Sequence, residues 1–213
     1  MNNLIEKINK SIDAAERGES KLSLEILNMK GLSGPKHRNF LNNIIDSSTR
    51  YLEVGTWTGS TLISALYKNS PEFHIGIDNF TIFCENGDRR AEFHANCKTH
   101  LGYAPNFLDQ NCWDVSLKDN GISEINFYLY DGCHKQRSQE KAITHFSTGL
   151  ADEFILMVDD WNEESARIGT IDGLKKSGIE MVYRRELFTE KNAVKHDWWN
   201  GLLVAACKKY ELI

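Results

Sequence analysis

Three features that would assign this chain to a common functional class are missing from its sequence. Its longest apolar runs, residues 154–158 and 201–207, are far too short to cross a bilayer. A net charge of −5 without a long basic run gives no general attraction to a nucleic-acid backbone. Five scattered cysteines form no Cys-x-x-Cys pair, and the opening residues lack the apolar stretch of a secretory signal. We therefore expect a cytoplasmic protein with reduced thiols that acts neither on nucleic acid nor at a membrane.

The composition that remains is that of an ordinary globular protein. The chain has 213 residues, of which 41% are hydrophobic and 26% are charged, which suffices for one domain with a sizeable core. Residues 3–17 carry apolar side chains at helical spacing, and Gly34 and Pro35 punctuate the chain further on. We expect a helical N-terminal extension over residues 1–34 and a main domain over residues 35–213.

From residue 50 onward, short apolar runs alternate with segments of helical pattern. The runs predicted to be strands are residues 50–55, 73–78, 106–114, 125–132 and 153–161. Such near-continuous apolar runs are typical of strands buried on both faces of a parallel sheet. Two further strands, residues 180–187 and 199–209, have no helix between them, which predicts an antiparallel hairpin at one edge. The pattern therefore predicts a doubly wound α/β fold with a mostly parallel, seven-stranded sheet.

Acidic side chains recur at the points where these predicted strands end. In an open α/β sheet, ligands bind beyond the carboxyl ends of the strands. A buried carboxylate is costly unless it is paired or bound to a ligand, so packing alone does not explain five acidic strand ends. The residues concerned are Glu53, Asp78, Asp114, Asp131 and the pair Asp159–Asp160.

The stretch EVGTWTGST, residues 53–61, has the outline of a strand end, a tight glycine turn and the start of a helix. Such a turn can hold the phosphates of a dinucleotide when it has the form G-x-G-x-x-G. Here the middle glycine is missing, and Trp57 stands near its place. This departure argues against a dinucleotide site, and it leaves a different nucleotide site or a purely structural turn as alternatives.

Taken together, these motifs resemble the class I S-adenosylmethionine-dependent methyltransferases over roughly residues 30–207. The glycine turn is similar to the first motif of that family, and bulky residues within the turn are typical of its catechol-type O-methyltransferases. The sequence YLEVG with GST, and Asp-Gly-Cys-His at residues 131–134, most resemble a bacterial and phage branch that includes sugar and antibiotic O-methyltransferases. The resemblance implies a Rossmann-like methyltransferase fold.

The same resemblance implies which residues bind S-adenosylmethionine. The turn would hold the methionine end of the cofactor, Asp78 would accept hydrogen bonds from the ribose hydroxyls, and Asp114 would read the adenine amino group. The predicted cofactor-binding residues are Glu53, Gly55, Thr56, Trp57, Gly59, Ser60, Asp78, Asn79, Trp113, Asp114 and Asp131.

The resemblance also implies a magnesium site and a catalytic base. Asp131, Asp159 and Asp160 match the positions that bind Mg²⁺ in catechol-type enzymes, and oxygen ligands suit this hard cation. A bound cation would lower the pKa of a substrate hydroxyl. Asp131 and His134 are the catalytic candidates, because a neutral imidazole can take the hydroxyl proton. Helix capping by Asp159 or Asp160, and capping or packing by His134, are the alternatives.

We therefore expect an S-adenosylmethionine-dependent O-methyltransferase that acts on a small molecule or a sugar, with Mg²⁺ assistance as one form of the reaction. An NAD-dependent oxidoreductase and a non-catalytic cofactor-binding module are the rival interpretations. The sequence identifies neither the methyl acceptor nor the oligomeric state, so a homo-oligomer stays open.

Overall fold

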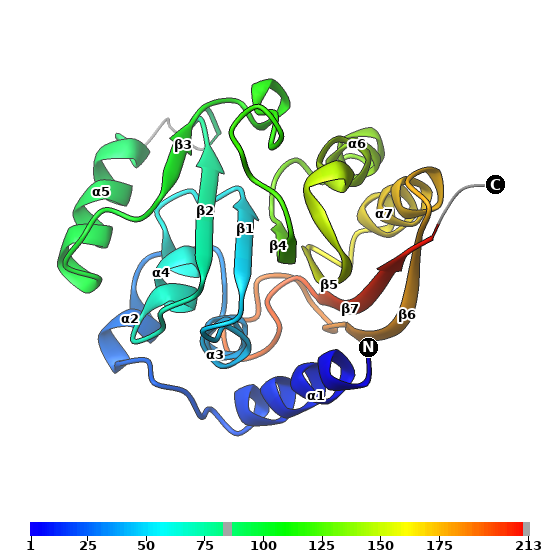
Figure 1. The fold of residues 1–213 in the computed structure, drawn as a ribbon. Coiled ribbons are helices and arrows are strands. Elements are labelled where there is room, and N and C mark those ends of the chain that lie inside the picture. Colours follow the sequence, from blue (N-terminus) through cyan, green and yellow to red (C-terminus); the bar gives the residue numbers. More distant parts are fainter. Residues whose placement is uncertain (83–86, 211–213) are drawn as a thin grey trace.

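The computed structural model describes residues 1–82 and 87–210, which form an α/β fold around a seven-stranded sheet (Figure 1). The strand order is β3-β2-β1-β4-β5-β7-β6. The first five strands pair in parallel, whereas β7 runs antiparallel to both of its neighbours. The strands are β1 (Arg50–Val54), β2 (Phe73–Asp78), β3 (Phe107–Asp109), β4 (Ile125–Tyr130), β5 (Leu150–Asp159), β6 (Ile179–Leu187) and β7 (Leu202–Lys209). The predicted doubly wound, mostly parallel sheet with an antiparallel edge hairpin is confirmed.

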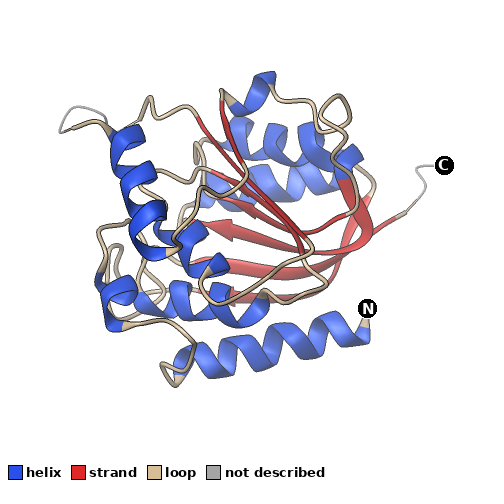
Figure 2. Ribbon diagram, turned by 60° about the vertical axis from the view of Figure 1, so that its left-hand side comes forward, coloured by secondary structure: helices blue, strands red, loops and turns tan. Residues whose placement is uncertain are grey.

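Helices cover both faces of the sheet (Figure 2). Five of them share one buried hydrophobic cluster with the first face: α1 (Asn2–Glu16), α2 (Leu24–Asn28), α3 (Pro35–Ile44), α4 (Ser60–Leu66) and α5 (Arg89–His100). On the second face pack α6 (Gln136–Phe146), α7 (Glu164–Lys176) and the short 3₁₀ helix η2 (Ser147–Gly149). In the described part of the chain, no helix is long and apolar enough to cross a membrane.

The N-terminal segment packs onto the same core as the rest of the chain. Ile8, Ile12 and Ala15 lie on one face of α1, and with Ile26 of α2 they are buried in the cluster that also holds β7. Their spacing of three and four residues gives the apolar stripe of an amphipathic helix. The division into residues 1–34 and 35–213 stays a prediction.

The third strand is shorter than the sequence predicted. We expected a strand over residues 106–114, but β3 ends at Asp109 and the 3₁₀ helix η1 (Cys112–Asp114) follows. The Asn111 side chain accepts a hydrogen bond from the Trp113 N–H at 3.2 Å, which is a local turn that competes with the sheet ladder. Trp113 and Asp114 therefore lie in η1 and not at the end of the strand.

The connections of the sheet reverse direction at β1, which pairs with β2 on one side and with β4 on the other. Two backbone hydrogen bonds continue past the end of β1, from Gly55 N–H to Ile77 at 2.9 Å and from Asp131 N–H to Val54 at 2.8 Å. These hydrogen bonds align the carboxyl ends of β1, β2 and β4 at one edge of the sheet. Open α/β sheets bind their ligands at such a switch point, so this edge is where a site is expected.

Candidate active site

The turn after β1 has a backbone that requires its glycines. Gly55 and Gly59 have φ angles of +95° and +90°, in the left-handed region that glycine adopts without a steric penalty. A Cβ atom at residue 55 would lie 2.0 Å from the backbone oxygen of Asp131. The turn therefore approaches the end of β4 as closely as only glycine permits. Trp57 also has a positive φ, of +44°, which is rare for a bulky residue.

Asp78, at the end of β2, ties that strand to the glycine turn. Its Oδ2 accepts a hydrogen bond from the Trp57 N–H at 2.8 Å, and its Oδ1 accepts one from the Phe80 N–H at 2.7 Å. A carboxylate has about four acceptor positions, so half-buried Asp78 can still accept hydrogen bonds from a ligand. The neighbouring Asn79 side chain accepts a hydrogen bond from the Thr81 hydroxyl at 2.8 Å. The ribose contact of Asp78, and a cofactor contact of Asn79, stay predictions.

Glu53 lies beneath the turn and is fully buried, with 0% of its surface exposed. Its Oε1 accepts a hydrogen bond from the Thr61 hydroxyl at 2.6 Å, and its Oε2 accepts one from the Tyr51 hydroxyl. Burial raises the pKa of Glu53 to about 7, although these two hydrogen bonds act in the opposite direction. Glu53 therefore supports the turn from inside the core, and its direct contact with a cofactor stays a prediction.

Two hydroxyl groups complete the turn. Thr56 is 2% exposed, and its Oγ1 is buried without a hydrogen-bond partner among the described residues. The Oγ of Ser60 lies 3.3 Å from the Oγ of Ser33, in the segment before α3. Buried polar atoms normally have a partner, so an orphaned hydroxyl beside a glycine turn and Asp78 fits a site that a polar ligand completes. The residues at this edge therefore fit a nucleotide-like cofactor such as S-adenosylmethionine.

The two tryptophans predicted to contact the cofactor already have partners within the protein. The guanidinium of Arg89 lies 5.1 Å from the centre of the Trp57 ring. The ammonium of Lys141 lies 4.4 Å from the centre of the Trp113 ring. These cation–π contacts fasten the turn to α5 and η1 to α6. Asp114 is exposed, and the adenine contacts of Trp113 and Asp114 stay predictions.

Asp131, Asp159 and Asp160 meet where β4 and β5 end, and we call these three residues the acidic corner. Asp159, which is 6% exposed, accepts a hydrogen bond at Oδ1 from Nε2 of His37 at 3.0 Å. His37 belongs to α3 and is itself 1% exposed. A helix far away in the sequence therefore supplies the partner of this buried carboxylate.

His134 lies between the other two carboxylates of the acidic corner. Its Nε2 is 3.3 Å from Oδ2 of Asp160 and 3.8 Å from Oδ1 of Asp131. The remaining oxygen of Asp160, Oδ1, accepts a hydrogen bond from the Asn200 amide at 2.7 Å. The side chain of His134 is 29% exposed, so it can meet a bound molecule, whereas His37 cannot.

The pKa values of the acidic corner move in different directions. Burial and the negative charges of Asp159 and Asp160 raise the pKa of Asp131 well above its usual value. Burial acts on Asp159 as well, but the hydrogen bond and charge of His37 outweigh it, and the pKa of Asp159 is lowered. Burial and the charge of Asp159 raise the pKa of Asp160. Asp159 is therefore the member of the group that holds its negative charge most firmly.

The capping alternative for the acidic pair does not match the structure. Helix α7 has Glu163 as its N-cap residue, and no side chain caps it by a hydrogen bond. His134 lies before Lys135, the N-cap residue of α6, which likewise has no side-chain cap. Asp159, Asp160 and His134 instead contact one another and residues from distant parts of the chain.

The side chains of the predicted magnesium site, Asp131, Asp159 and Asp160, are not arranged as ligands of one cation. Within residues 1–82 and 87–210, no group of three or more His, Cys, Asp or Glu side chains is placed to hold a metal ion. One oxygen of Asp159 and one of Asp160 accept hydrogen bonds from protein donors. As arranged, the acidic corner does not fit Mg²⁺, so no reaction step is assigned to a metal here.

Two residues that contact the acidic corner, His37 and Asn200, were not predicted from the sequence. His37 stands in a segment, GLSGPKHRNF, whose resemblance to the methyltransferase branch was the only available pointer. Asn200 immediately precedes the glycine that leads into β7. Neither residue has a local pattern that reports its role, because each meets its carboxylate through tertiary packing alone.

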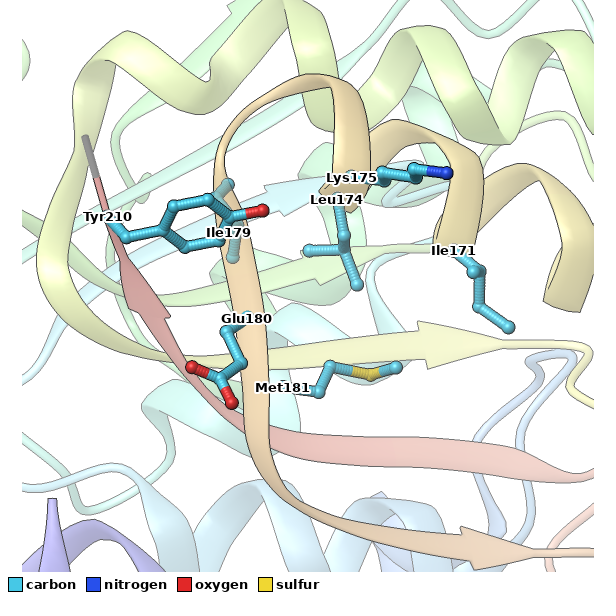
Figure 3. A pocket seen from close by; sticks show the side chains of 7 residues that line it. All are labelled: Ile171, Leu174, Lys175, Ile179, Glu180, Met181 and Tyr210. Carbon is cyan, nitrogen blue, oxygen red and sulfur yellow. The ribbon is translucent and has the colours of Figure 1, made fainter. Parts of the chain in front are cut away.

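A separate hollow of about 470 Å³ lies between the end of α7, the start of β6 and the residue that follows β7 (Figure 3). Its lining residues are Ile171, Leu174, Lys175, Ile179, Glu180, Met181 and Tyr210. Because β6 runs parallel to β5, the start of β6 lies at the opposite edge of the sheet from the acidic corner. The hollow is therefore not part of the candidate site.

Comparison with known proteins relates this chain to others through its fold. A scan against protein-family models and a search of the curated proteins found no match. Among solved structures, the O-methyltransferase from Bacillus cereus in complex with SAH matches with a TM-score of 0.59 at 12% identity, covering 97% of this chain and 91% of that one. TYW2 from M. jannaschii in complex with AdoMet matches with a TM-score of 0.59 at 13% identity, covering 86% and 78%. The chain has a methyltransferase fold.

A third match shows how far this fold similarity extends. SMU.776, which is described as a methyltransferase and was crystallised with SAH, has a TM-score of 0.60 at 14% identity, over 84% of this chain and 50% of that one. The chain thus spans about half the length of that protein, and 47% of a further match from Streptococcus mutans. Identities this low establish the shared fold, while the activity, substrate and partners are matters for a proposal.

Proposed function

We propose that this protein is an S-adenosylmethionine-dependent O-methyltransferase whose acceptor is a small molecule or a sugar. One observation carries the proposal: the glycine turn and the acidic corner lie against each other at the switch point of the sheet, where a Cβ atom on Gly55 would be 2.0 Å from the backbone of Asp131. A cofactor on the turn and an acceptor at the corner would therefore be neighbours, as group transfer requires.

The residues of the turn would hold the cofactor. Asp78 has free acceptor positions for ribose hydroxyls. The buried Oγ1 of Thr56 has no hydrogen-bond partner among the described residues, so a polar group of the cofactor could bond to it. When bound, S-adenosylmethionine supplies an electrophilic methyl group on a sulfonium, whose carbon–sulfur bond breaks with its electron pair staying on sulfur as an acceptor oxygen bonds the carbon. The solved structures of the same fold that contain SAH or AdoMet support this cofactor.

His134 would take the proton that the acceptor hydroxyl loses. It is the half-buried histidine beside Asp131 and Asp160, with its Nε2 3.3 Å from Asp160. The carboxyl groups on either side would stabilise the imidazolium that forms. Asp131 is the other candidate base, and burial together with the charges of Asp159 and Asp160 raises its pKa.

The rival interpretations are less well supported. An NAD-dependent oxidoreductase would be expected to have the middle glycine that Trp57 replaces. A non-catalytic module that only binds the cofactor would not need the half-buried His134 between two carboxylates. Magnesium assistance would place a cation among carboxylates that already accept hydrogen bonds from His37 and Asn200.

Calorimetry with S-adenosylmethionine, SAH and NAD tests the cofactor. We expect the first two ligands to bind and NAD not to bind. In Asp78→Asn, one acceptor oxygen is replaced by an amide that cannot accept, so the affinity for S-adenosylmethionine should fall about tenfold or more. Asp119→Asn, an exposed carboxylate before β4, is the matched control and should bind normally. Binding of NAD alone, or of none of the ligands below millimolar concentration, would contradict the proposal.

A further inference from the structure

The acidic corner concentrates three carboxylates, and the protein itself supplies their partners. His37 donates to Asp159, and Asn200 donates to Asp160. His134 faces both Asp160 and Asp131. Mg²⁺ is usually held by one or two carboxylates together with waters or substrate oxygens. The structure instead places nitrogen atoms of the protein beside oxygens of all three carboxylates.

We propose that two histidines replace a metal ion at the acidic corner: His37 positions Asp159 from within the core, His134 meets the acceptor, and methyl transfer needs no divalent cation. The inference rests on the proposed function for its catalytic part. Its structural part, that protein donors hold these carboxylates, is independent of what the enzyme methylates.

The environment of His37 fits a positioning role. Its ring lies 5.7 Å from the ring of Trp198, which is 3% exposed. The indole Nε1 of Trp198 donates a hydrogen bond to Glu16 of α1 at 2.6 Å. His37 is thus enclosed by side chains that are themselves fixed, and with 1% of its surface exposed it cannot touch an acceptor. His37 can therefore affect the reaction only by positioning Asp159.

A cation that took Oδ1 of Asp159 as a ligand would have to displace His37. That step would break a hydrogen bond to a buried, ionised carboxylate and leave the imidazole without that partner, which is costly. Asp160 is constrained as well, because its backbone has a φ of +55° and its Oδ1 is bonded to Asn200. Nε2 of His134 lies 3.3 Å from the other oxygen of Asp160 and 3.8 Å from Oδ1 of Asp131, so a cation bound between these two carboxylates would compete with the imidazole.

The two histidines also explain why three acidic residues can lie so close together. Like charges in contact raise one another's pKa and oppose ionisation. His37 on the buried side and His134 on the open side each place an imidazole nitrogen beside a carboxylate. The carboxylates of the corner therefore have partners among the protein's own side chains.

The first test uses Mn²⁺, a paramagnetic substitute for Mg²⁺, titrated into the full chain and followed by electron paramagnetic resonance. We expect no binding below millimolar concentration, or only binding that persists in Asp159→Asn and therefore lies elsewhere. Micromolar binding that disappears in Asp159→Asn would overturn the proposal, because the carboxylates would then leave their protein donors for a cation.

The second test compares His37→Leu with His37→Gln, using calorimetry with S-adenosylmethionine and methyl transfer to an acceptor found in a substrate panel. Leucine removes the donor, whereas the glutamine amide can donate from nearly the same place. We expect kcat to fall about tenfold or more in His37→Leu, with the cofactor affinity unchanged, and to recover largely in His37→Gln. Normal kcat in His37→Leu, or equal losses in both variants together with lost cofactor binding, would overturn the positioning role.

The two proposals fail separately in these experiments. Lack of S-adenosylmethionine binding by the unmodified chain would contradict the proposed function. The Mn²⁺ titration would still show whether the carboxylates bind a cation or keep their protein donors. Conversely, if the chain binds the cofactor and also binds Mn²⁺ tightly through Asp159, the proposed function stands and the proposal of a metal-free corner fails. EDTA treatment should leave methyl transfer unchanged, and a loss restored by Mg²⁺ would overturn the inference.

Discussion

The glycine turn and the acidic corner lie side by side at one edge of the sheet, yet they are built in different ways. Around the turn, Glu53 bonds to Tyr51 and Thr61, two and eight residues away. At the corner, Asp159 bonds to a histidine 122 residues away, and Asp160 bonds to an asparagine 40 residues away. The hydrogen bonds of Glu53 beneath the turn are thus local, whereas the hydrogen-bond partners of Asp159 and Asp160 come from distant segments.

This difference suggests a division of labour within the proposed enzyme. The support that Glu53 gives the turn depends on neighbouring residues, so it can be kept while more distant segments change. A corner assembled from α3, the end of β5 and the residues before β7 changes with any of these segments. The acceptor side is therefore the part that would set which molecule is methylated, and the following predictions test the contrast.

The largest effect is expected for Gly55→Ala. The new Cβ atom would lie 2.0 Å from the Asp131 oxygen at a φ of +95°, so β1 and β4 would have to move apart. We expect a loss of several kcal/mol of unfolding free energy, on the order of 4 kcal/mol, together with loss of cofactor binding. Urea unfolding and calorimetry measure the two effects.

Gly121→Ala is the control for this substitution. Gly121 also has a positive φ, of +68°, but nothing lies within 4 Å of its Cβ position. It should lose only about 1 kcal/mol, the cost of the backbone conformation. If the two variants were equally stable, close approach to β4 would not be what the glycine turn requires.

The next effect concerns the open side of the corner. His134→Ala removes the proposed base, so kcat should fall by about 10²–10⁴, while the affinity for S-adenosylmethionine stays unchanged because the turn is untouched. Initial rates on an accepted substrate and calorimetry measure both quantities. His196→Ala, at an exposed position of the loop before β7, should behave as the unmodified chain does. A parallel loss of cofactor binding in His134→Ala would show that the two halves of the site are not separable.

The third prediction concerns pH and the buried support of the turn. Burial raises the pKa of Glu53 from its ordinary value of 4.5 to about 7 in the folded protein. Folding therefore gains stability from protonated Glu53 below about pH 4.5, and this contribution is lost as the pH rises through 7. Its full size is on the order of 3 kcal/mol.

Urea unfolding at pH values from 4.5 to 8 checks this prediction in the unmodified chain and in Glu53→Gln. The substitution removes the titrating group, so the difference in stability between the two chains should change across that window. As the pH rises, only the unmodified chain loses the stabilisation that comes from protonated Glu53. Its stability should therefore fall relative to that of Glu53→Gln. Parallel pH profiles would show that Glu53 does not titrate in this range.

The sequence predicted the fold and the glycine turn well, for reasons that particular elements make clear. Buried parallel strands such as β1 and β4 are apolar runs between turns, so they can be recognised without a partner. The glycine turn was placed correctly because two glycines in nine positions, both with positive φ, leave a visible pattern. Strand β3 was predicted too long, since the Asn111 turn that ends it depends on one side-chain hydrogen bond.

The sequence by itself determined the order of strands and helices, the glycine turn and the acidic residues that follow the strands, because each depends on neighbours along the chain. Tertiary structure alone decided that β7 lies between β5 and β6, that Glu53 is sealed beneath the turn, and that His37 and Asn200 meet the acidic corner. These outcomes depend on contacts between segments far apart in sequence, whose energies are settled by how the whole core packs.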